Sequence, residues 1–406
     1  MLTILFATPF FNAFAIRTIF TLGGLPDVRL GVISQQPQET LSPEVRARIA
    51  AHWRVDNALE LGQLTWAAEA LVQQLGTAHR LLAINEQIQE PVAKVRERLG
   101  IEGTRAEVAR NFRDKARMKD LLRAAGVPVA RHKLAMHEGE AWNFVGRVGF
   151  PIVIKPPAGA ASQATFRAGT ADELLYALAQ THPRPDQPIL LEEFITGEEY
   201  SFDTFSVKGQ AVWHSWTRYL PTPLEVMRND WIQWRVLLPR EVEGGVGEVI
   251  RPIGEQALAA LGMETGLSHL EWFRRADGSV AVSEVGMRPA GAQITTLMSR
   301  AHEFDCIEAW ARLMVFGEFT PPERKYAAGA AYLRGMGQGR VRGVHGIEEI
   351  QREFGEMITD AKWPQVGQEK SLSYEGEGFV ILRHAETKVV EEALLKIVNT
   401  VRVQLG

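Results

Sequence analysis

The sequence predicts a multidomain protein of the mixed α/β and α+β class. Short apolar strands and helical patterns alternate over about the first hundred residues, which is typical of βαβ units on a parallel sheet. The stretch from Tyr200 to about Gly291 is instead rich in strands, with one helix near Gly247–Leu261. Because a chain of 406 residues is too long for one ordinary core, we expect several domains.

The N-terminal region is expected to build its parallel sheet from strands at Leu2–Ala7, Val28–Ile33 and Arg80–Ile84. Its apolar start imitates a signal peptide, but no basic residue precedes the apolar run and Pro9 interrupts it. We therefore expect a buried strand that turns at Pro9 into a helix ending near Gly23-Gly24. No G-x-G-x-x-G motif follows this strand, which disfavours a dinucleotide-binding oxidoreductase.

Helix signals recur further along the chain. "TRAE", from Thr104 to Glu107, and "TADE", from Thr170 to Glu173, both fit a capping box at a helix N-terminus. Further helices are expected at about Glu303–Phe316 and at Thr387–Val403. The last of these, together with nearby strands, predicts a small appended C-terminal domain.

Composition excludes several classes of function. A formal charge of −4 and a pI near 6.3 lack the basic excess that nucleic-acid binding requires. Cys306 is the single cysteine, so an intramolecular disulfide and a Cys/His metal cluster are both excluded. No later stretch reaches the roughly 18 apolar residues of a membrane span. We expect a cytoplasmic protein that binds neither nucleic acid nor membrane.

A predicted hairpin carries a carboxylate near each end. Asp277-Gly278 is a two-residue turn signal, so the flanking strands should pair and bring Glu271 and Glu284 together. Two adjacent carboxylates repel unless a proton or a divalent cation lies between them, and Mg²⁺ with substrate phosphates suits such a pair. Arg288, just beyond, is able to clamp a phosphate or carboxylate. A solvated hairpin with charged ends is the alternative.

Lysines and a small-residue loop form a second candidate group. Lys155 ends the apolar strand "FPIVIK" and requires an anionic partner there. The following loop offers Gly159 and Ser162, whose backbone N–H groups suit phosphate oxygens, although the spacing is not that of a Walker A motif. Lys115, in a helical stretch, has an ordinary surface lysine as its alternative.

A third candidate is the linker Ile195–Gly197 between two predicted strands. Adenine binds well against exposed backbone groups of such linkers, and Glu199 lies near enough to reach ribose hydroxyls. An ordinary strand–turn–strand is equally compatible with this stretch.

Substrate recognition is expected between the linker and the hairpin, where aromatic and basic residues are dense. They suit a pocket for a carboxylate and an apolar side chain, and core packing is the alternative. The residues concerned are Trp213, Trp216, Trp231, Trp234, Arg218, Arg228 and Arg235. His269, beside Glu271, either orients a ligand or is a satisfied core histidine.

Taken in order, these elements resemble the ATP-grasp superfamily, and within it the carboxylate–amine ligases that include the L-amino-acid ligases. Four motifs carry the resemblance: "RDKARMKDLLRAAGVPVA", "GFPIVIKPPAGAASQAT", "LLEEFITGEEYSFD" and "HLEWFRRADGSVAVSEVGMRPAGAQI". The resemblance runs from about Asn111 to Phe316. It implies an ATP-grasp fold with domains at 1–110 (parallel-sheet α/β), 111–190 (small lobe), 191–320 (large lobe with the metal site) and 321–406 (α+β).

The resemblance also implies a role for each candidate residue. Lys115 and Lys155 hold the α- and β-phosphates, beneath a flap at Gly159–Thr165 that includes Ser162. Adenine meets Glu192 and the backbone of Glu193 and Ile195, and Glu199 binds ribose. The remaining roles are Mg²⁺ or Mn²⁺ binding by Glu271 and Glu284, and contact with the transferred phosphoryl group and the intermediate by Arg288.

One position departs from the family's pattern. Many members have an asparagine two residues after the second metal carboxylate, and this chain has Gly286 there. Some amide-forming members also lack that asparagine, so activity is still expected, with the second ion held by Glu284 and phosphate oxygens.

The implied reaction is ATP-dependent activation of a small-molecule carboxylate as an acyl phosphate, followed by attack of an amine. Amino acids are among the candidate substrates, and a homodimer is one of the open oligomeric states. Three rival functions remain at this stage: a biotin-carboxylase-like enzyme, a ribotide-formylating or ribotide-carboxylating ligase, and a non-catalytic ATP-binding module.

Overall fold

The N-terminal unit is a four-stranded parallel sheet in the order β3-β2-β1-β4. The computed structural model describes residues 1–158 and 165–406. As expected, β1 is buried and leads into a helix, whose N-terminus is capped by Asn12 where Oδ1 accepts from the Ala15 N–H at 2.9 Å. The unit contains β1 (Leu2–Ala7), α1 (Ala13–Leu22), β2 (Val28–Ser34), the 3₁₀ helix η1 (Gln38–Thr40), α2 (Pro43–Arg46), β3 (Ala51–Arg54), α3 (Leu61–Leu75), β4 (Arg80–Leu82), η2 (Glu86–Ile88) and α4 (Gln89–Leu99).

Two helices connect this unit to a small lobe built on a four-stranded antiparallel sheet, in the order β5-β8-β6-β7. Thr170 caps α8 as predicted, since its Oγ1 accepts from the Glu173 N–H, while the Glu173 carboxylate accepts from the Gly169 N–H. The elements are α5 (Ala106–Arg113), α6 (Lys115–Ala124), β5 (His132–Ala135), α7 (Glu138–Val148), β6 (Ile152–Lys155), β7 (Phe166–Ala168), α8 (Ala171–Thr181) and β8 (Ile189–Glu193).

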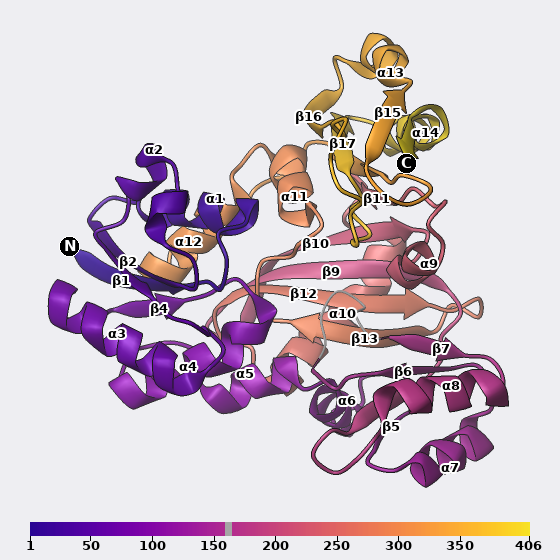
Figure 1. The fold of residues 1–406 in the computed structure, drawn as a ribbon, viewed down its shortest axis with the longest axis horizontal. Coiled ribbons are helices and arrows are strands. Elements are labelled where there is room, and N and C mark those ends of the chain that lie inside the picture. Colours follow the sequence, from indigo (N-terminus) through magenta and orange to yellow (C-terminus); the bar gives the residue numbers. More distant parts are fainter. Residues whose placement is uncertain (159–164) are drawn as a thin grey trace.

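A large antiparallel sheet of eight strands crosses the middle of the molecule, in the order β13-β12-β9-β10-β11-β14-β17-β16 (Figure 1). It includes the predicted hairpin, β12–β13, at one edge. The elements in this part are β9 (Glu198–Val207), β10 (Gln210–Leu220), α9 (Pro223–Arg228), β11 (Arg235–Leu238), α10 (Gly245–Leu261), β12 (Gly266–Arg274), β13 (Val280–Gly286), α11 (Ile294–His302) and α12 (Cys306–Phe316).

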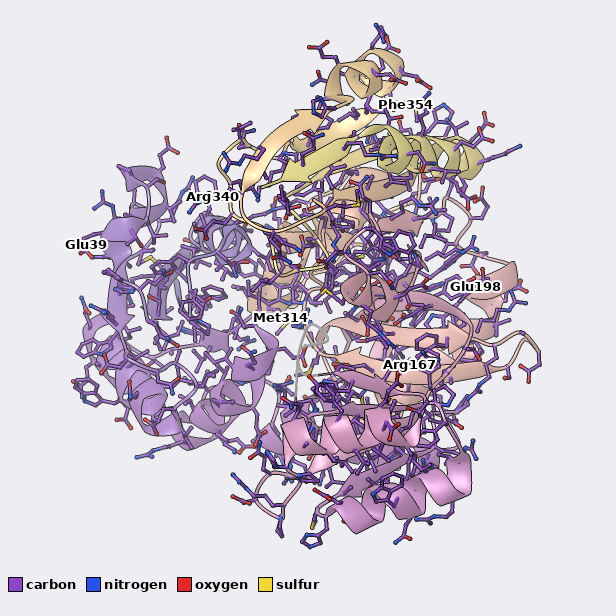
Figure 2. The ribbon with its side chains drawn as sticks, turned by 45° about the vertical axis from the view of Figure 1, so that its right-hand side comes forward. Glu39, Arg167, Glu198, Met314, Arg340 and Phe354 are labelled. Atoms are coloured by element: carbon purple, nitrogen blue, oxygen red, sulfur yellow. The ribbon has the colours of Figure 1, made fainter. Side chains whose placement is uncertain are left out.

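The C-terminal segment does not form a sheet entirely of its own, because three of its strands extend the large sheet. Its elements are β14 (Ala327–Leu333), β15 (Val341–His345), α13 (Ile347–Phe354), β16 (Ile358–Lys362), β17 (Gly378–His384), α14 (Thr387–Thr400) and β18 (Arg402–Leu405). In Figure 2 the labelled Glu39, Arg167 and Phe354 mark the N-terminal unit, the small lobe and the C-terminal segment.

Several local predictions were wrong. Thr104 does not cap α5, because the helix begins two residues later and Arg105 occupies the N-cap without a side-chain hydrogen bond. The last helix ends at Thr400, and the alternating residues that follow form β18, which pairs with β15. The Asp277-Gly278 turn has three loop residues, since Arg275 N donates to Ser279 O and Gly278 takes a positive φ of 81°.

Hydrophobic packing joins the units. One core cluster contains β1 and α1 residues such as Ile4 and Ile19 together with Leu297 of α11, Trp310 of α12 and Trp234 beside β11. Burial of such apolar surface is the main favourable term in folding, so the N-terminal unit and the large sheet stabilise each other. Among the described residues, no helix combines the length and apolar character needed to span a membrane.

Candidate functional site

Nine residues of the predicted site line one cavity, which lies between the small lobe and the large sheet. They come from α6, β6, β8, the linker after β8, β9, β12, β13 and the turn after β13. Gly159 and Ser162 lie outside the described residues, whereas Thr165 lines the cavity. The nine residues are Lys115, Lys155, Glu192, Glu193, Ile195, Glu199, Glu271, Glu284 and Arg288.

The hairpin places its two carboxylates directly opposite each other, with Glu271 paired to Glu284 in the β12–β13 register. Each has a basic group beside it: Lys115 Nζ lies 2.8 Å from Glu284 Oε1, and His269 Nε2 lies 3.5 Å from Glu271 Oε1. Burial raises the pKa of Glu284, but Lys115 and Lys155 outweigh that effect and hold the pKa below its usual value. The Glu284 carboxylate is therefore ionised near neutral pH.

Lys155 lies against a buried carboxylate, as its position at a strand end predicted. Its Nζ is 3.0 Å from Glu192 Oε2, and Lys119 Nζ is 3.3 Å from Glu192 Oε1. Burial opposes ionisation of Glu192, but the two lysines bring its pKa down to about 2. Burial likewise disfavours the charge on Lys155, and Glu192 and Glu284 outweigh it, so the pKa of Lys155 is raised.

Lys119 is a site residue that sequence reasoning missed. It is fully buried, and its Nζ also donates to the Ser283 carbonyl at 2.8 Å. Desolvation lowers the pKa of Lys119 despite the nearby Glu192. The i, i+4 spacing from Lys115 was the available signal, because it places both lysines on one face of α6.

The linker after β8 has one backbone group that is open to a ligand. Glu193 N donates to the Arg131 carbonyl at 2.9 Å, and the Glu193 carboxylate contacts Arg131 and Arg275. Across the described part of the chain, the Ile195 N–H makes no hydrogen bond. Glu199 is buried close to Glu271, and both burial and that neighbouring charge raise its pKa well above the usual value.

Arg288 is held by a residue from the N-terminal unit. Its Nη2 lies 3.1 Å from Glu86 Oε2, and its Nη1 donates to the Pro289 carbonyl at 2.9 Å. The other Glu86 oxygen lies 2.8 Å from Arg113 Nη1. Glu86 was not predicted, although it follows a parallel strand at its carboxyl end, where α/β folds commonly place ligand-binding residues.

His269 lies between two carboxylates. Its Nδ1 is 2.8 Å from Asp203 Oδ1, and Asp203 in turn accepts a hydrogen bond from Ser201 Oγ at 2.8 Å. Burial lowers the pKa of His269, but Asp203 and Glu271 outweigh it and raise the pKa to about 10. The Tyr219 hydroxyl lies 3.4 Å from His269 Nε2. Asp203 therefore fixes the ring with Nε2 facing the cavity, so His269 is a site residue as well as a buried one.

Seven aromatic and basic residues were expected around the substrate. In the described part of the chain, Trp234 lines the cavity and the other six do not. Trp213 packs in the core against Phe205, while Trp231 is 67% exposed. Arg218 is engaged with Glu198 and Glu391 at the molecular surface. Strand alternation explains the outcome for Trp216 and Arg218, which lie on the face of β10 opposite the cavity-lining Tyr219.

The donor set fits a divalent cation. Two facing carboxylates at the rim of a cavity lined by lysines suit Mg²⁺ that is also held by nucleotide phosphates. In the described residues, no group of three or more His, Cys, Asp or Glu side chains forms a self-sufficient metal site. Gly286 has room for a side chain, since a Cβ there would lie 3.8 Å from the His269 carbonyl and 3.9 Å from Arg288 Cγ.

Comparison with known proteins agrees with this geometry. Residues 148–296 match the family described as "ATP-grasp domain". The L-arginine-specific L-amino acid ligase of Bacillus subtilis is 26% identical over 228 residues, which are 55% of this chain and 54% of that protein. D-alanine–D-alanine ligase A of Mesorhizobium japonicum is 29% identical over 197 residues, covering 45% of this chain and 53% of the relative. The chain thus spans about half the length of these curated relatives.

Solved structures extend the likeness to the whole chain. An L-amino acid ligase from Bacillus licheniformis superposes with a TM-score of 0.80 at 16% identity, covering 100% of this chain and 99% of the other. N5-carboxyaminoimidazole ribonucleotide synthetase from Thermotoga maritima gives a TM-score of 0.71 at 17% identity, with both chains fully covered. The predicted resemblance is confirmed: the protein has the ATP-grasp fold, and its residues 148–296 match the ATP-grasp domain.

Proposed function

We propose that this protein is an ATP-dependent ligase that activates a carboxylate as an acyl phosphate and joins it to an amine. The observation that carries the proposal is the convergence of Lys115, Lys155, Glu271, Glu284 and Arg288 on one cavity. Three cations face two carboxylates there, which suits the triphosphate of a nucleotide and its metal. The similarity to L-amino acid ligases and D-alanine–D-alanine ligases supports the same reaction class.

The nucleotide is proposed to lie between the two lobes. Lys115 and Lys155 neutralise its phosphates, the free Ile195 N–H donates to adenine, and Glu199 accepts from ribose hydroxyls. The Glu192 carboxylate is already engaged by Lys119 and Lys155, so its role is to position Lys155 at the edge of the adenine site.

Glu271 and Glu284 would hold Mg²⁺ or Mn²⁺, which supplies positive charge against the phosphate oxygens when it is bound. His269 and Lys115 stand beside these carboxylates and orient them. Arg288, held by Glu86, presents its guanidinium to the phosphoryl group in transfer.

The reaction has two balanced steps. A carboxylate oxygen of the acid attacks the γ-phosphorus of ATP, the bond to the β–γ bridging oxygen breaks, and ADP leaves. The amine nitrogen then attacks the acyl carbon, phosphate leaves, and the nitrogen loses a proton to give the amide. The protein contributes orientation and charge neutralisation in both steps.

A screen of ADP release over pairs of acids and amines tests this proposal. With the true acid present, hydroxylamine should trap the acyl phosphate as a hydroxamate, with ADP as co-product. AMP and pyrophosphate would instead indicate adenylation and refute the acyl-phosphate route. ADP release that requires bicarbonate with biotin or a ribotide would favour the rival carboxylating functions.

A further inference from the structure

We infer that the acid substrate carries an uncharged, apolar side chain, which seats against Tyr219, Leu224, Trp234 and Tyr374. The inference rests on the proposed function and assigns a substrate class to the same cavity. These four residues line the cavity together with His269 and Arg288, which mark its reactive end.

Three aromatic rings form one wall of this subsite. Trp234 lies between Tyr219 and Tyr374, with ring centroids 5.3 and 4.9 Å away and interplanar angles of 65° in both cases. The Trp234 Nε1–H donates to the Pro221 carbonyl at 2.9 Å, so its polar edge is satisfied by the protein. What the indole offers a ligand is therefore apolar ring surface.

A turn before α11 also lines the cavity and is held in place by its surroundings. Ala292 and Gln293 have positive φ values of 48° and 56°, which non-glycine residues adopt only when the surroundings enforce them. The Tyr332 hydroxyl donates to the Ala292 carbonyl, and the Tyr332 ring stacks on Trp234 at 5.0 Å. Tyr332 thus fixes the turn and the aromatic wall to each other, so this part of the cavity lining is rigid.

Charge is confined to the reactive end. The charged residues at that end are His269, Arg288 and their partners Glu271 and Glu86. The other described residues that line this side of the cavity are uncharged: Tyr219, Pro223, Leu224, Trp234, Gly291, Ala292, Ile294 and Tyr374. A charged side chain or a ribotide phosphate would lose its hydration here without gaining a partner. Bicarbonate has no group to fill the space, whereas an aliphatic or aromatic side chain removes apolar surface from water.

Two kinds of acid share this chemistry and are separated by the test. L-Leucine and L-phenylalanine carry an α-amino group, while 4-methylpentanoate and 3-phenylpropanoate do not. With hydroxylamine as the amine, we expect kcat/KM for hydroxamate formation to rise about 10- to 100-fold from alanine to leucine or phenylalanine, or along the matching series without the amino group. Aspartate, lysine and bicarbonate should be at least as poor as alanine.

Substitutions of the residues that form the proposed subsite provide a second test. Leu224 is a half-buried residue of α9, and Leu224→Glu places a carboxylate there. This variant should lower kcat/KM for the preferred acid by about 10- to 100-fold, while the KM for ATP stays within about two-fold. Leu395→Glu, at a leucine of α14 that is 46% exposed, should leave both constants unchanged. Trp234→Phe should shift preference toward larger side chains, and Trp231→Phe, at an exposed site, should not.

The outcomes separate the inference from the proposed function. Hydroxamate formation with charged acids as efficient as with apolar ones would overturn the substrate class and leave the ligase reaction standing. An unchanged acid preference in folded Leu224→Glu and Trp234→Phe variants would do the same. If no acid yields ADP and a hydroxamate, the ligase proposal fails, and the substrate class fails with it.

Discussion

At the scale of single residues, most carboxylates of the candidate site have a basic group within reach. Lys115 lies beside Glu284 and Lys155 beside Glu192. Burial raises the pKa of both carboxyl groups, but the neighbouring lysines together outweigh it and lower both pKa values. A nucleotide with its metal would exchange these internal pairs for lysine–phosphate and carboxylate–metal contacts. The charges that the proposed reaction requires are therefore in place before substrates bind.

Replacing Glu284 by glutamine should abolish Mg²⁺-dependent ATP turnover, because the phosphoryl transfer loses one of its two metal-binding carboxylates. ADP release measured across a Mg²⁺ titration gives the result, and circular dichroism checks the fold. Glu264→Gln, at an exposed carboxylate before β12, is the matched control. Normal turnover in the Glu284 variant would remove this residue from the metal site.

Lys155→Met keeps the apolar stem and deletes the charge. We expect the free energy of ATP binding to weaken by about 2–4 kcal/mol, the range for truncating one partner of a desolvated ion contact. Titration calorimetry measures the affinity, with Lys133→Met on β5 of the same sheet as the control. Lys119 still neutralises Glu192 in this variant, so the fold should persist. An unchanged affinity would contradict the phosphate-binding role.

At the scale of elements, α6 and η2 connect parts of the chain that lie far apart in sequence. Within one turn of α6, Lys115 reaches Glu284 of β13, and Lys119 reaches both Glu192 of β8 and the Ser283 carbonyl. The helix thus ties the small-lobe sheet to the large sheet. Similarly, Glu86 of η2 holds Arg288 beyond β13, so the N-terminal unit helps to orient the reactive end of the cavity.

Arg288→Ala should lower kcat by about 10²–10³ while ATP affinity stays within a few-fold, since a preorganised charge acts chiefly on the transition state. Glu86→Gln should lower kcat less, because the guanidinium remains and only its anchor weakens. Steady-state kinetics and nucleotide binding, measured on both variants, separate these effects. A loss of ATP affinity equal to the loss of kcat would instead place Arg288 among the nucleotide-binding residues.

At the scale of the whole molecule, buried polar contacts join the large sheet to α11. Arg324 Nε donates to His302 Nε2 at 2.9 Å and its Nη2 to Ser215 Oγ at 2.6 Å, while His302 Nδ1 lies 2.7 Å from the Met298 carbonyl. With Nδ1–H as the donor, both ring nitrogens are satisfied in the neutral form. Burial and Arg324 lower the pKa of His302 to about 3.

This histidine predicts an acid-sensitive fold. Between the unfolded pKa of 6.5 and the folded value of about 3, the unfolded chain binds more protons, so His302 lowers stability as pH falls below about 6.5. The free energy of unfolding should fall between pH 7 and pH 5 in both proteins. The fall should be about 2 kcal/mol larger in the wild type than in His302→Gln. Urea unfolding at both pH values measures this, and His345→Gln is the exposed control. Equal losses in the wild type and His302→Gln would contradict the assignment.

Much of the fold was predictable because its signals are local. Alternation and the Asp277-Gly278 turn predicted the hairpin, and its register does place Glu271 opposite Glu284. The N-terminal strand and helix were predicted from an apolar run, a turn at Pro9 and a helix end near Gly23-Gly24. The short edge strand β3 (Ala51–Arg54) was missed, since four residues carry too little pattern to reveal a strand.

The sequence by itself determined which residues are candidates for the chemistry, because a lysine at a strand end or paired carboxylates on a hairpin are unusual unless something binds them. Only the tertiary structure decided their partners. Glu86 is 202 residues from Arg288, and Lys119 is 164 residues from Ser283. Such contacts depend on how the lobes and sheets pack, which the spacing of residues along the chain does not predict. The same reason applies to the aromatic residues: the segment between α9 and β11 places Trp234 in the cavity lining and leaves its neighbour Trp231 in solvent.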